Sequence, residues 1–130
     1  MVATAFTGDG ADSTFADIGT VFLGPGRDHG YAEGATLKGG PGDDRLISAT
    51  SANSLAGGSG RDHLSGLGGE ETFAGGANKD LIVARGGDDL VHAAEPGRDT
   101  VRCGGGKDRV AISAEDRAFG CERVVRRLHR

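Results

Sequence analysis

A glycine-rich phrase of nine residues recurs through most of this chain and limits the folds open to it more than any other feature. Its clearest copies begin at Gly39 (GGPGDDRLI), Gly57 (GGSGRDHLS) and Gly75 (GGANKDLIV). Looser copies in the same register begin at Ser48, Gly66, Ala84, Ala94 and Cys103. Eight copies in one register are far more than chance would give, so we treat the repeat as real.

Two places in the phrase carry its physical meaning. The sixth place holds an acidic or amide side chain in every copy: Asp44, Asn53, Asp62, Glu71, Asp80, Asp89, Asp99 and Asp108. The eighth place is apolar: Leu46, Leu55, Leu64, Phe73, Ile82, Val91, Val101 and Val110. The glycines permit a tight turn, and one inward side chain fits a very short β-strand. A single unit cannot bury its apolar residue but stacked units can, which predicts a solenoid.

This register resembles the RTX family, whose nonapeptide reads G-G-x-G-x-D-x-U-x. The resemblance covers roughly residues 8 to 111 and is most specific between Gly39 and Ala111. It implies an all-β fold, a right-handed parallel β-roll (β-solenoid) with about 16–18 residues per turn and roughly six to seven turns. In that family two nonapeptides form one turn. Calcium lies in the loops at both edges, shared by carboxylates and backbone carbonyls from successive turns.

The N-terminal third contains a related repeat of sixteen residues. Residues 15–21 align with residues 31–37, and residues 24–28 align with residues 40–44. A step from glycine, or once asparagine, to aspartate then continues at intervals of 16, 16, 18, 18 and 19 residues, ending at Asp12, Asp28, Asp44, Asp62, Asp80 and Asp99. We therefore predict one domain, with an N-terminal cap (1–8), 16-residue repeats (9–38), the RTX-like array (39–111) and a C-terminal cap with a basic tail (112–130).

Composition agrees with a solenoid. The chain has 130 residues, 25 of them Gly, with no Trp and only 5% aromatic residues, which is too lean for an ordinary globular core. The glycines lack the three-residue period of collagen. The sequence shows neither a membrane span nor the apolar stretch of a signal peptide. No HExxH or GxSxG motif is present, so we predict that the protein is not an enzyme.

The stacked acids predict a cation. Neighbouring strands lie about 4.8 Å apart, so aspartates in successive turns face one another at that spacing. Two such charges repel by roughly 3 kcal/mol at an effective dielectric of 20. Calcium accepts six to eight oxygens in flexible geometry, whereas magnesium demands stricter octahedral ligation. We therefore expect Ca²⁺ as the cofactor, with about four to six ions bound.

The predicted carboxylate ligands follow the two edges of the roll. One edge carries Asp12, Asp28, Asp44, Asp62, Asp80 and Asp99. The other carries Asn53, Glu71, Asp89 and Asp108, and only its last pair keeps both aspartates of the family pattern. The resemblance implies further ligands through the backbone carbonyls of Gly26, Gly42, Gly60, Asn78, Gly97, Gly87 and Gly106. Asp43 and Asp88 are expected to face solvent. The alternative for any single aspartate is that it binds no metal and is a solvated turn residue or forms an Asx-turn with the nearby backbone.

The two cysteines obey the same spacing. Cys103 and Cys121 are 18 residues apart, which is one full turn, so their Cα atoms should lie within disulfide range. A disulfide here indicates an oxidising, extracellular compartment. Two buried free thiols are the alternative. A zinc site is not expected, because the chain has no C-x-x-C motif and its histidines are scattered.

The leading functional prediction is a secreted, monomeric calcium-binding protein that folds on binding calcium, with neither nucleic acid nor membrane span involved. The alternatives are an adhesion module for a protein or glycan, and an ice-binding solenoid. Ice binding would need a ladder of outward threonines. The outward places read Thr20, Thr36, Arg45, Ser54, His63, Thr72, Leu81, Leu90, Thr100 and Arg109, which we interpret as no ladder. The C-terminal arginines are interpreted as a solvated cap rather than an anion-binding site.

Overall fold

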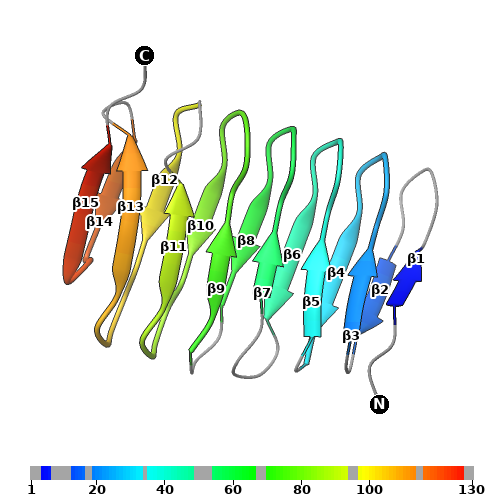
Figure 1. Cartoon of the computed structure of the whole chain (residues 1–130), viewed down its shortest axis with the longest axis horizontal. Helices are drawn as coiled ribbons and strands as arrows, with labels where there is room; N and C mark the ends of the chain where they lie inside the picture. The colour runs from blue at the N-terminus through cyan, green and yellow to red at the C-terminus, as the bar shows by residue number, and fades with distance from the viewer. Residues whose placement is uncertain are drawn as a thin grey trace.

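The structure is a computed structural model, and it describes residues 4–6, 13–16, 19–33, 35–48, 54–66, 70–93, 97–113 and 116–127. Every regular element in these ranges is a short β-strand (Figure 1). Within the same ranges, no helix is long and apolar enough to cross a membrane.

The strands alternate between two parallel sheets. Sheet A has eight strands: β1 (Thr4–Phe6), β3 (Gly19–Phe22), β5 (Ala35–Lys38), β7 (Ser54–Ala56), β9 (Thr72–Ala74), β11 (Leu90–Ala93), β13 (Arg109–Ser113) and β15 (Arg123–Arg127). Sheet B has seven: β2 (Ser13–Ala16), β4 (His29–Ala32), β6 (Arg45–Ser48), β8 (His63–Ser65), β10 (Leu81–Val83), β12 (Thr100–Arg102) and β14 (Arg117–Phe119). Each strand from β1 to β13 pairs in parallel with the strand two further along the chain. The predicted all-β parallel β-solenoid is confirmed.

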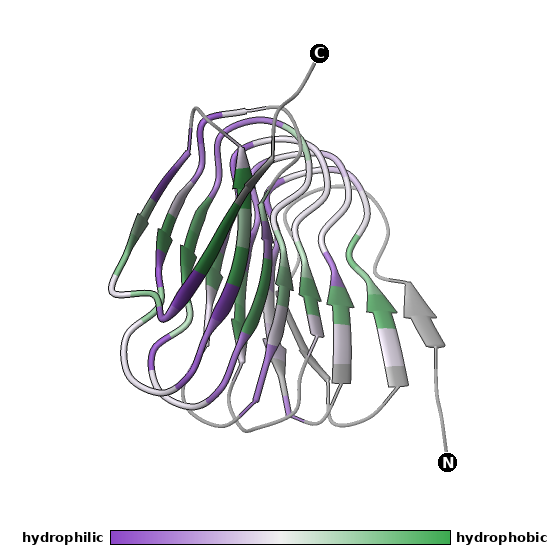
Figure 2. Ribbon diagram, turned by 60° about the vertical axis from the view of Figure 1, so that its left-hand side comes forward, coloured by the Kyte–Doolittle hydropathy of each residue, from purple (hydrophilic) through white to green (hydrophobic). Residues whose placement is uncertain are grey.

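The apolar eighth place of the repeat forms the core between the sheets. Leu46, Leu64, Ile82 and Val101 lie in register on sheet B, and each is fully buried. On sheet A the fully or almost fully buried column is Leu37, Leu55, Phe73, Val91 and Val110. Figure 2 shows the hydrophobic colour concentrated in the strands, while the loops at both edges are pale or purple. The two-residue step from acid to apolar residue thus places the acids just outside the core.

The loops stack so closely that the fourth place requires glycine in most turns. Gly42 and Gly60 have φ angles of +110° and +98°. A Cβ at Gly60 would collide with the carbonyl oxygen of Gly42 in the turn before it. The same stacking recurs where Gly97 follows Asn78, itself at φ +78°. Glycine here permits both the left-handed backbone and the short distance between turns.

Strand pairing continues beyond residue 111. Strand β14 pairs with β12, and β15 pairs with β13 through five residue pairs. Cys103 and Cys121 form a disulfide with a Cα–Cα distance of 5.0 Å, as their spacing predicts. The division of the chain into caps, 16-residue repeats and nonapeptide array stays a prediction.

Candidate metal centre

Acidic side chains line both edges of the roll, each directly before a strand. The long ladder precedes the strands of sheet B and consists of Asp28, Asp44, Asp62, Asp80, Asp99 and Asp116. The short ladder precedes β9, β11 and β13 of sheet A and consists of Glu71, Asp89 and Asp108. All nine residues are at most 3% exposed. Burying so many carboxylates in rows requires compensation, since an isolated buried charge is strongly unfavourable.

One oxygen of each aspartate connects it to the turn before. The main-chain N–H of Asp44 donates to Oδ1 of Asp62, and that of Asp62 donates to Oδ1 of Asp80, both at 2.9 Å. The short ladder repeats the arrangement, because the N–H of Asp89 donates to Oδ1 of Asp108 at 2.9 Å. Across both ladders these bonds span 2.7–2.9 Å. The Oδ1 atoms therefore act as structural acceptors between turns.

The main-chain carbonyls of the ladder residues also form hydrogen bonds to the next turn. The carbonyl oxygen of Asp44 accepts the N–H of His63, and that of Asp62 accepts the N–H of Leu81, at 2.8 and 2.9 Å. In the short ladder the carbonyl of Asp89 accepts the N–H of Arg109 at 2.9 Å. These bonds extend the sheet pairing into the loops. They fix the position of each carboxylate relative to the next.

The second carboxylate oxygen is different. Oδ2 of Asp44, Asp62, Asp89 and Asp108 is buried and has no hydrogen-bond partner among the described residues. The Oδ2 atom of Asp62 lies against the α-carbon of Gly57, where a Cβ would collide with it. A buried acceptor without a donor costs about 1–3 kcal/mol, and more when it is charged. Such an oxygen is what a bound cation would satisfy.

The protonation of these groups reflects the same cost. Burial raises the pKa of Asp62 to about 7, although the backbone hydrogen bond opposes the shift, and the charge of Asp44 adds to it. Burial likewise raises the pKa of Asp44 to about 6 and that of Asp89 to about 7. The pKa of Asp108 is also raised, chiefly by burial. Without a cation the ladders resist carrying full negative charge at neutral pH.

Main-chain carbonyls complete the available donor set. The predicted carbonyl ligand at Gly42 points along the roll toward Gly60 of the next turn, and the carbonyl of Gly87 points toward Gly106. No group of three or more His, Cys, Asp or Glu side chains is close enough to hold a metal within the described ranges. A bound ion would thus draw on paired carboxylates supplemented by carbonyls. That all-oxygen set suits calcium.

The structure places most of the predicted ligands but not all of them. Asp12 and Asn53 lie outside the described residues. Asp43 and Asp88 are exposed, in line with the expectation that they face solvent. Even so, Oδ1 of Asp43 accepts the N–H of Arg61 at 2.8 Å, and Oδ1 of Asp88 accepts the N–H of Lys107 at 2.7 Å. A second, outer row of bonds between turns thus accompanies the ladders.

The sequence interpretation missed Asp116, the last member of the long ladder. Its Oδ1 accepts the N–H of Asp99 at 2.7 Å, and its Oδ2 accepts both the N–H and the hydroxyl of Ser113, at 2.7 and 2.9 Å. Protein donors therefore satisfy both oxygens of this carboxylate. The signal was the acid-x-apolar step from Asp116 to Ala118, which lacks the preceding glycine.

Glu71 departs from the aspartate pattern and is accommodated by a specific contact. Its side chain is 2% exposed, and its Oε1 accepts the hydroxyl of Ser48 at 3.2 Å. Its main-chain N–H donates to Oδ1 of Asp89 at 2.9 Å, as in the aspartate rungs. The longer side chain thus keeps its place in the ladder while bonding to an earlier turn.

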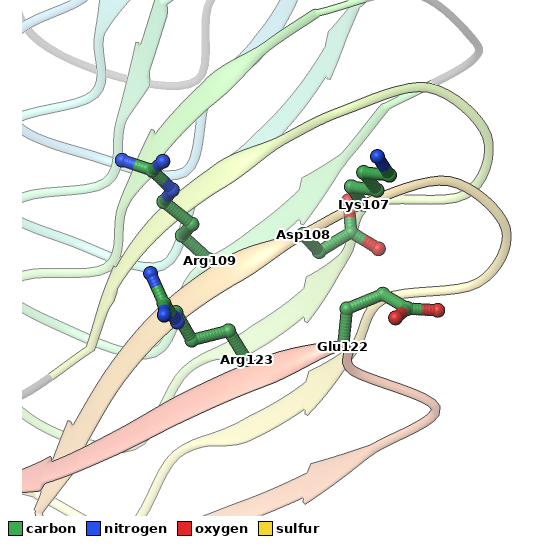
Figure 3. A pocket seen from close by; sticks show the side chains of 5 residues that line it. All are labelled: Lys107, Asp108, Arg109, Glu122 and Arg123. Atoms are coloured by element: carbon green, nitrogen blue, oxygen red, sulfur yellow. The ribbon is translucent and has the colours of Figure 1, made fainter.

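The last gap of this edge lies between Asp108 and Glu122. The main-chain N–H of Arg123 donates to the carbonyl of Asp108 at 3.0 Å. A shallow hollow here is lined by Lys107, Asp108, Arg109, Glu122 and Arg123. Figure 3 shows the carboxylates of Asp108 and Glu122 at the loop end of this hollow, with the guanidinium groups of Arg109 and Arg123 extending away from them. Glu122 is exposed, so this gap is more open than those inside the ladders.

Comparison with known proteins agrees with this geometry. Residues 29–64, 49–82 and 65–95 match the model of the RTX calcium-binding nonapeptide repeat (4 copies), and together they span just over half of the chain. No curated protein and no solved structure gives a match. The chain belongs to the RTX calcium-binding nonapeptide repeat family.

Proposed function

We propose that this protein is an extracellular calcium-binding module that folds when several Ca²⁺ ions, about four to six, bind between successive turns. One observation carries the proposal. Asp44 and Asp62 hold adjacent turns together through Oδ1 while each keeps a buried Oδ2 that no described protein group satisfies. Bound calcium would supply the missing positive charge at these oxygens.

The carboxylates of neighbouring rungs are the proposed ligands. In the long ladder these are Asp28, Asp44, Asp62, Asp80 and Asp99, and in the short ladder Asp89 and Asp108, with Glu71 in a lesser role. The carbonyls of the fourth loop place, as at Gly42 and Gly60, are the proposed main-chain ligands. We do not extend the metal sites to Asp116, because Ser113 already donates two hydrogen bonds to its Oδ2.

Coupling of binding to folding follows from where the ligands lie. Each proposed pair joins residues 16 to 19 positions apart, which come together only when the turns stack. Two ionised rungs repel one another when no ion is present, so the metal-free roll is disfavoured near neutral pH. A chain of this kind would stay unfolded at cytosolic calcium and fold after export, where calcium is abundant. The disulfide supports an oxidising destination.

Calcium titration of the metal-free protein tests the proposal. Far-UV circular dichroism should show coil in EGTA and β-signal in millimolar calcium, and calorimetry should give the number of ions. A β-signal that chelation leaves unchanged would refute the coupling of folding to calcium. The matched family is a calcium-binding repeat rather than a catalytic one. We propose that the protein has no enzymatic activity.

One observation bears on the ice-binding alternative. The strand register places Thr20, Thr36, Ser54 and Thr72 in one column of sheet A. The sequence series did not show this short hydroxyl column of three threonines and one serine, because it mixed residues of both sheets. The column ends at Leu90. A thermal-hysteresis assay on the calcium-loaded protein tests this alternative directly.

A further inference from the structure

Among the residues whose exposure the structure describes, the exposed charges of this acidic protein are predominantly positive. The chain has 19 acidic residues against 15 Lys and Arg, for a net charge of −4, yet nine of the acids are buried in the two ladders. Among residues whose exposure the structure describes, twelve Lys and Arg are exposed, against five acids: Glu33, Asp43, Glu70, Asp88 and Glu122. Among these residues, most of the acidic side chains are therefore buried, and the basic side chains are available to a partner.

Much of the exposed positive charge follows one line along the roll. The place before each long-ladder aspartate holds Arg27, Asp43, Arg61, Lys79 and Arg98 in successive turns. The first outward place of the adjoining strands of sheet B adds a parallel row. We call the following residues the basic stripe: Arg27, His29, Arg45, Arg61, His63, Lys79, Arg98 and Arg117.

The strand register aligns the strand row of the stripe at its two ends, and Leu81 and Thr100 interrupt that row between His63 and Arg117. Arg45 of β6 pairs with His29 of β4 on one side and with His63 of β8 on the other. At the C-terminal end, Arg117 pairs with Thr100. Successive strands repeat about every 4.8 Å, and each turn from Arg27 to Arg117 contributes one Lys or Arg to the stripe. Burial, together with the nearby arginines, lowers the pKa of His63, so this side chain adds little positive charge at neutral pH. Asp43 occupies the place between Arg27 and Arg61 in the outer row, and its Oδ1 accepts the N–H of Arg61.

The opposite edge provides an internal comparison. There the corresponding place before the ladder acid holds Glu70, Asp88 and Lys107. The asymmetry is therefore a property of one edge and its adjoining sheet. Shallow hollows also follow the stripe. Arg27, Arg45 and His63 border one together with Asp43 and Asp44. Arg61, Lys79 and Thr100 border the next together with Asp62 and Asp80.

We propose that the basic stripe binds an extended acidic polysaccharide, aligned along the roll axis. A straight row of cations at regular spacing complements a linear polymer that carries carboxylate or sulfate groups along its length. A single-stranded nucleic acid would call for large aromatic stacking platforms, and the stripe contains no Phe, Tyr or Trp. A membrane surface would call for a broad basic face rather than a line. The inference rests on the proposed function in one respect, since the stripe exists only in the folded roll.

Heparin, a soluble sulfated polysaccharide, is a suitable probe. The calcium-loaded wild-type protein should bind heparin by calorimetry, with an affinity that falls as salt rises, and should not bind neutral dextran. The triple variant Arg45→Gln, Arg61→Gln, Lys79→Gln should weaken binding by about tenfold or more, as expected for three lost exposed ion pairs. The matched control, Lys107→Gln, Arg109→Gln, Arg123→Gln, removes the same charge from the hollow of Figure 3 and should leave the affinity unchanged.

Equal weakening by both triple variants would overturn the stripe, because net charge alone would then explain binding. Tighter binding to phosphatidylserine vesicles or to duplex DNA than to heparin at equal ionic strength would overturn the choice of polysaccharide. If the wild-type protein is folded in calcium but does not bind heparin at low salt, the inference is wrong altogether. Circular dichroism of each variant in calcium and in EGTA measures folding separately from binding. If the roll stays folded in EGTA, calcium-dependent folding is wrong, but the stripe should still bind heparin in both solutions.

Discussion

The main-chain N–H of Asp44 donates a 2.9 Å hydrogen bond to Oδ1 of Asp62 in the next turn, while Oδ2 of Asp62 stays buried without a hydrogen-bond partner among the described residues. The two oxygens of one carboxylate therefore have separate roles. Oδ1 sets the spacing of the turns, and Oδ2 carries charge that the protein itself does not neutralise. Substitutions can separate the two roles.

The variant Asp62→Asn should lower calcium affinity without destabilising the metal-free roll. An amide oxygen can still accept the N–H of Asp44, but the buried charge is gone. We expect the calcium affinity to fall about tenfold, since these affinities depend on the number of charged ligands. Asp62→Ala should in addition lose the bond between turns, which costs about 1–3 kcal/mol. Calorimetric calcium titration measures the first effect. Circular dichroism of the calcium-free protein at pH 4.5, where acid favours the metal-free roll, measures the second.

Asp43→Asn is the matched control for this substitution. Asp43 is exposed and accepts the N–H of Arg61 as Asp62 accepts that of Asp44, but it lies outside the long ladder. The calcium affinity of the Asp43→Asn variant should stay close to that of the wild type. If Asp43→Asn and Asp62→Asn weaken calcium binding equally, the assignment of the ligands to the ladder is wrong.

Acid should stabilise the metal-free roll. Asp62 and Asp89 have pKa values of about 7 in the folded chain against an ordinary value of 3.8, so between these limits the folded state holds protons that the unfolded state has lost. The free energy of unfolding therefore falls as pH rises from about 4 to 7, by up to about 1.4 kcal/mol per pKa unit for each group. Circular dichroism of chelator-treated protein should show more β-structure at pH 4.5 than at pH 7.5.

Calcium should reverse this dependence, because protons and the ion compete for the same oxygens. Calcium affinity is expected to decline as pH drops below about 7, the pKa of Asp62 and Asp89. Metal-free protein that is best folded above pH 7, or calcium binding that is independent of pH between 5 and 8, would contradict the burial of ionisable ladders.

The disulfide between Cys103 and Cys121 should stabilise the last turn. It closes an 18-residue loop, for which the chain-entropy model gives about 3 kcal/mol. The double variant Cys103→Ser, Cys121→Ser should show this loss in urea unfolding at saturating calcium. A reducing agent should destabilise the wild type by a similar amount and leave the double variant unchanged. Two alkylatable thiols in the unreduced wild type would show that the pairing is wrong.

The sequence predicted the fold well because each turn repeats one simple rule. An acid followed two residues later by an apolar residue places one group at the edge and the other in the core, as for Asp62 and Leu64. The disulfide followed from the same spacing. What the sequence could not provide was the division of labour between Oδ1 and Oδ2, because side-chain orientation depends on the neighbouring turn.

Two misses have equally definite causes. Asp116 lacks the glycine step that identified the other rungs, and it was placed in the ladder only by the pairing of β14 with β12. The hydroxyl column of Thr36, Ser54 and Thr72 was hidden because consecutive repeats alternate between sheets. Residues that are neighbours in the list of repeats thus lie on opposite faces of the roll.

Arg85→Gly should stabilise the folded roll. Arg85 occupies the second loop place with φ +66°, where Gly40, Gly58, Gly76 and Gly104 also have positive φ. A left-handed backbone costs a residue with a Cβ about 1–2 kcal/mol, and glycine removes this cost. The greater entropy of glycine in the unfolded chain offsets about 0.5–1 kcal/mol of the gain. The expected gain is up to about 1.5 kcal/mol in urea unfolding at saturating calcium. Gly104→Ala, whose Cβ would press on the Arg85 carbonyl, should instead destabilise. Loss of stability in Arg85→Gly would mean that contacts of the arginine side chain outweigh backbone strain in this loop.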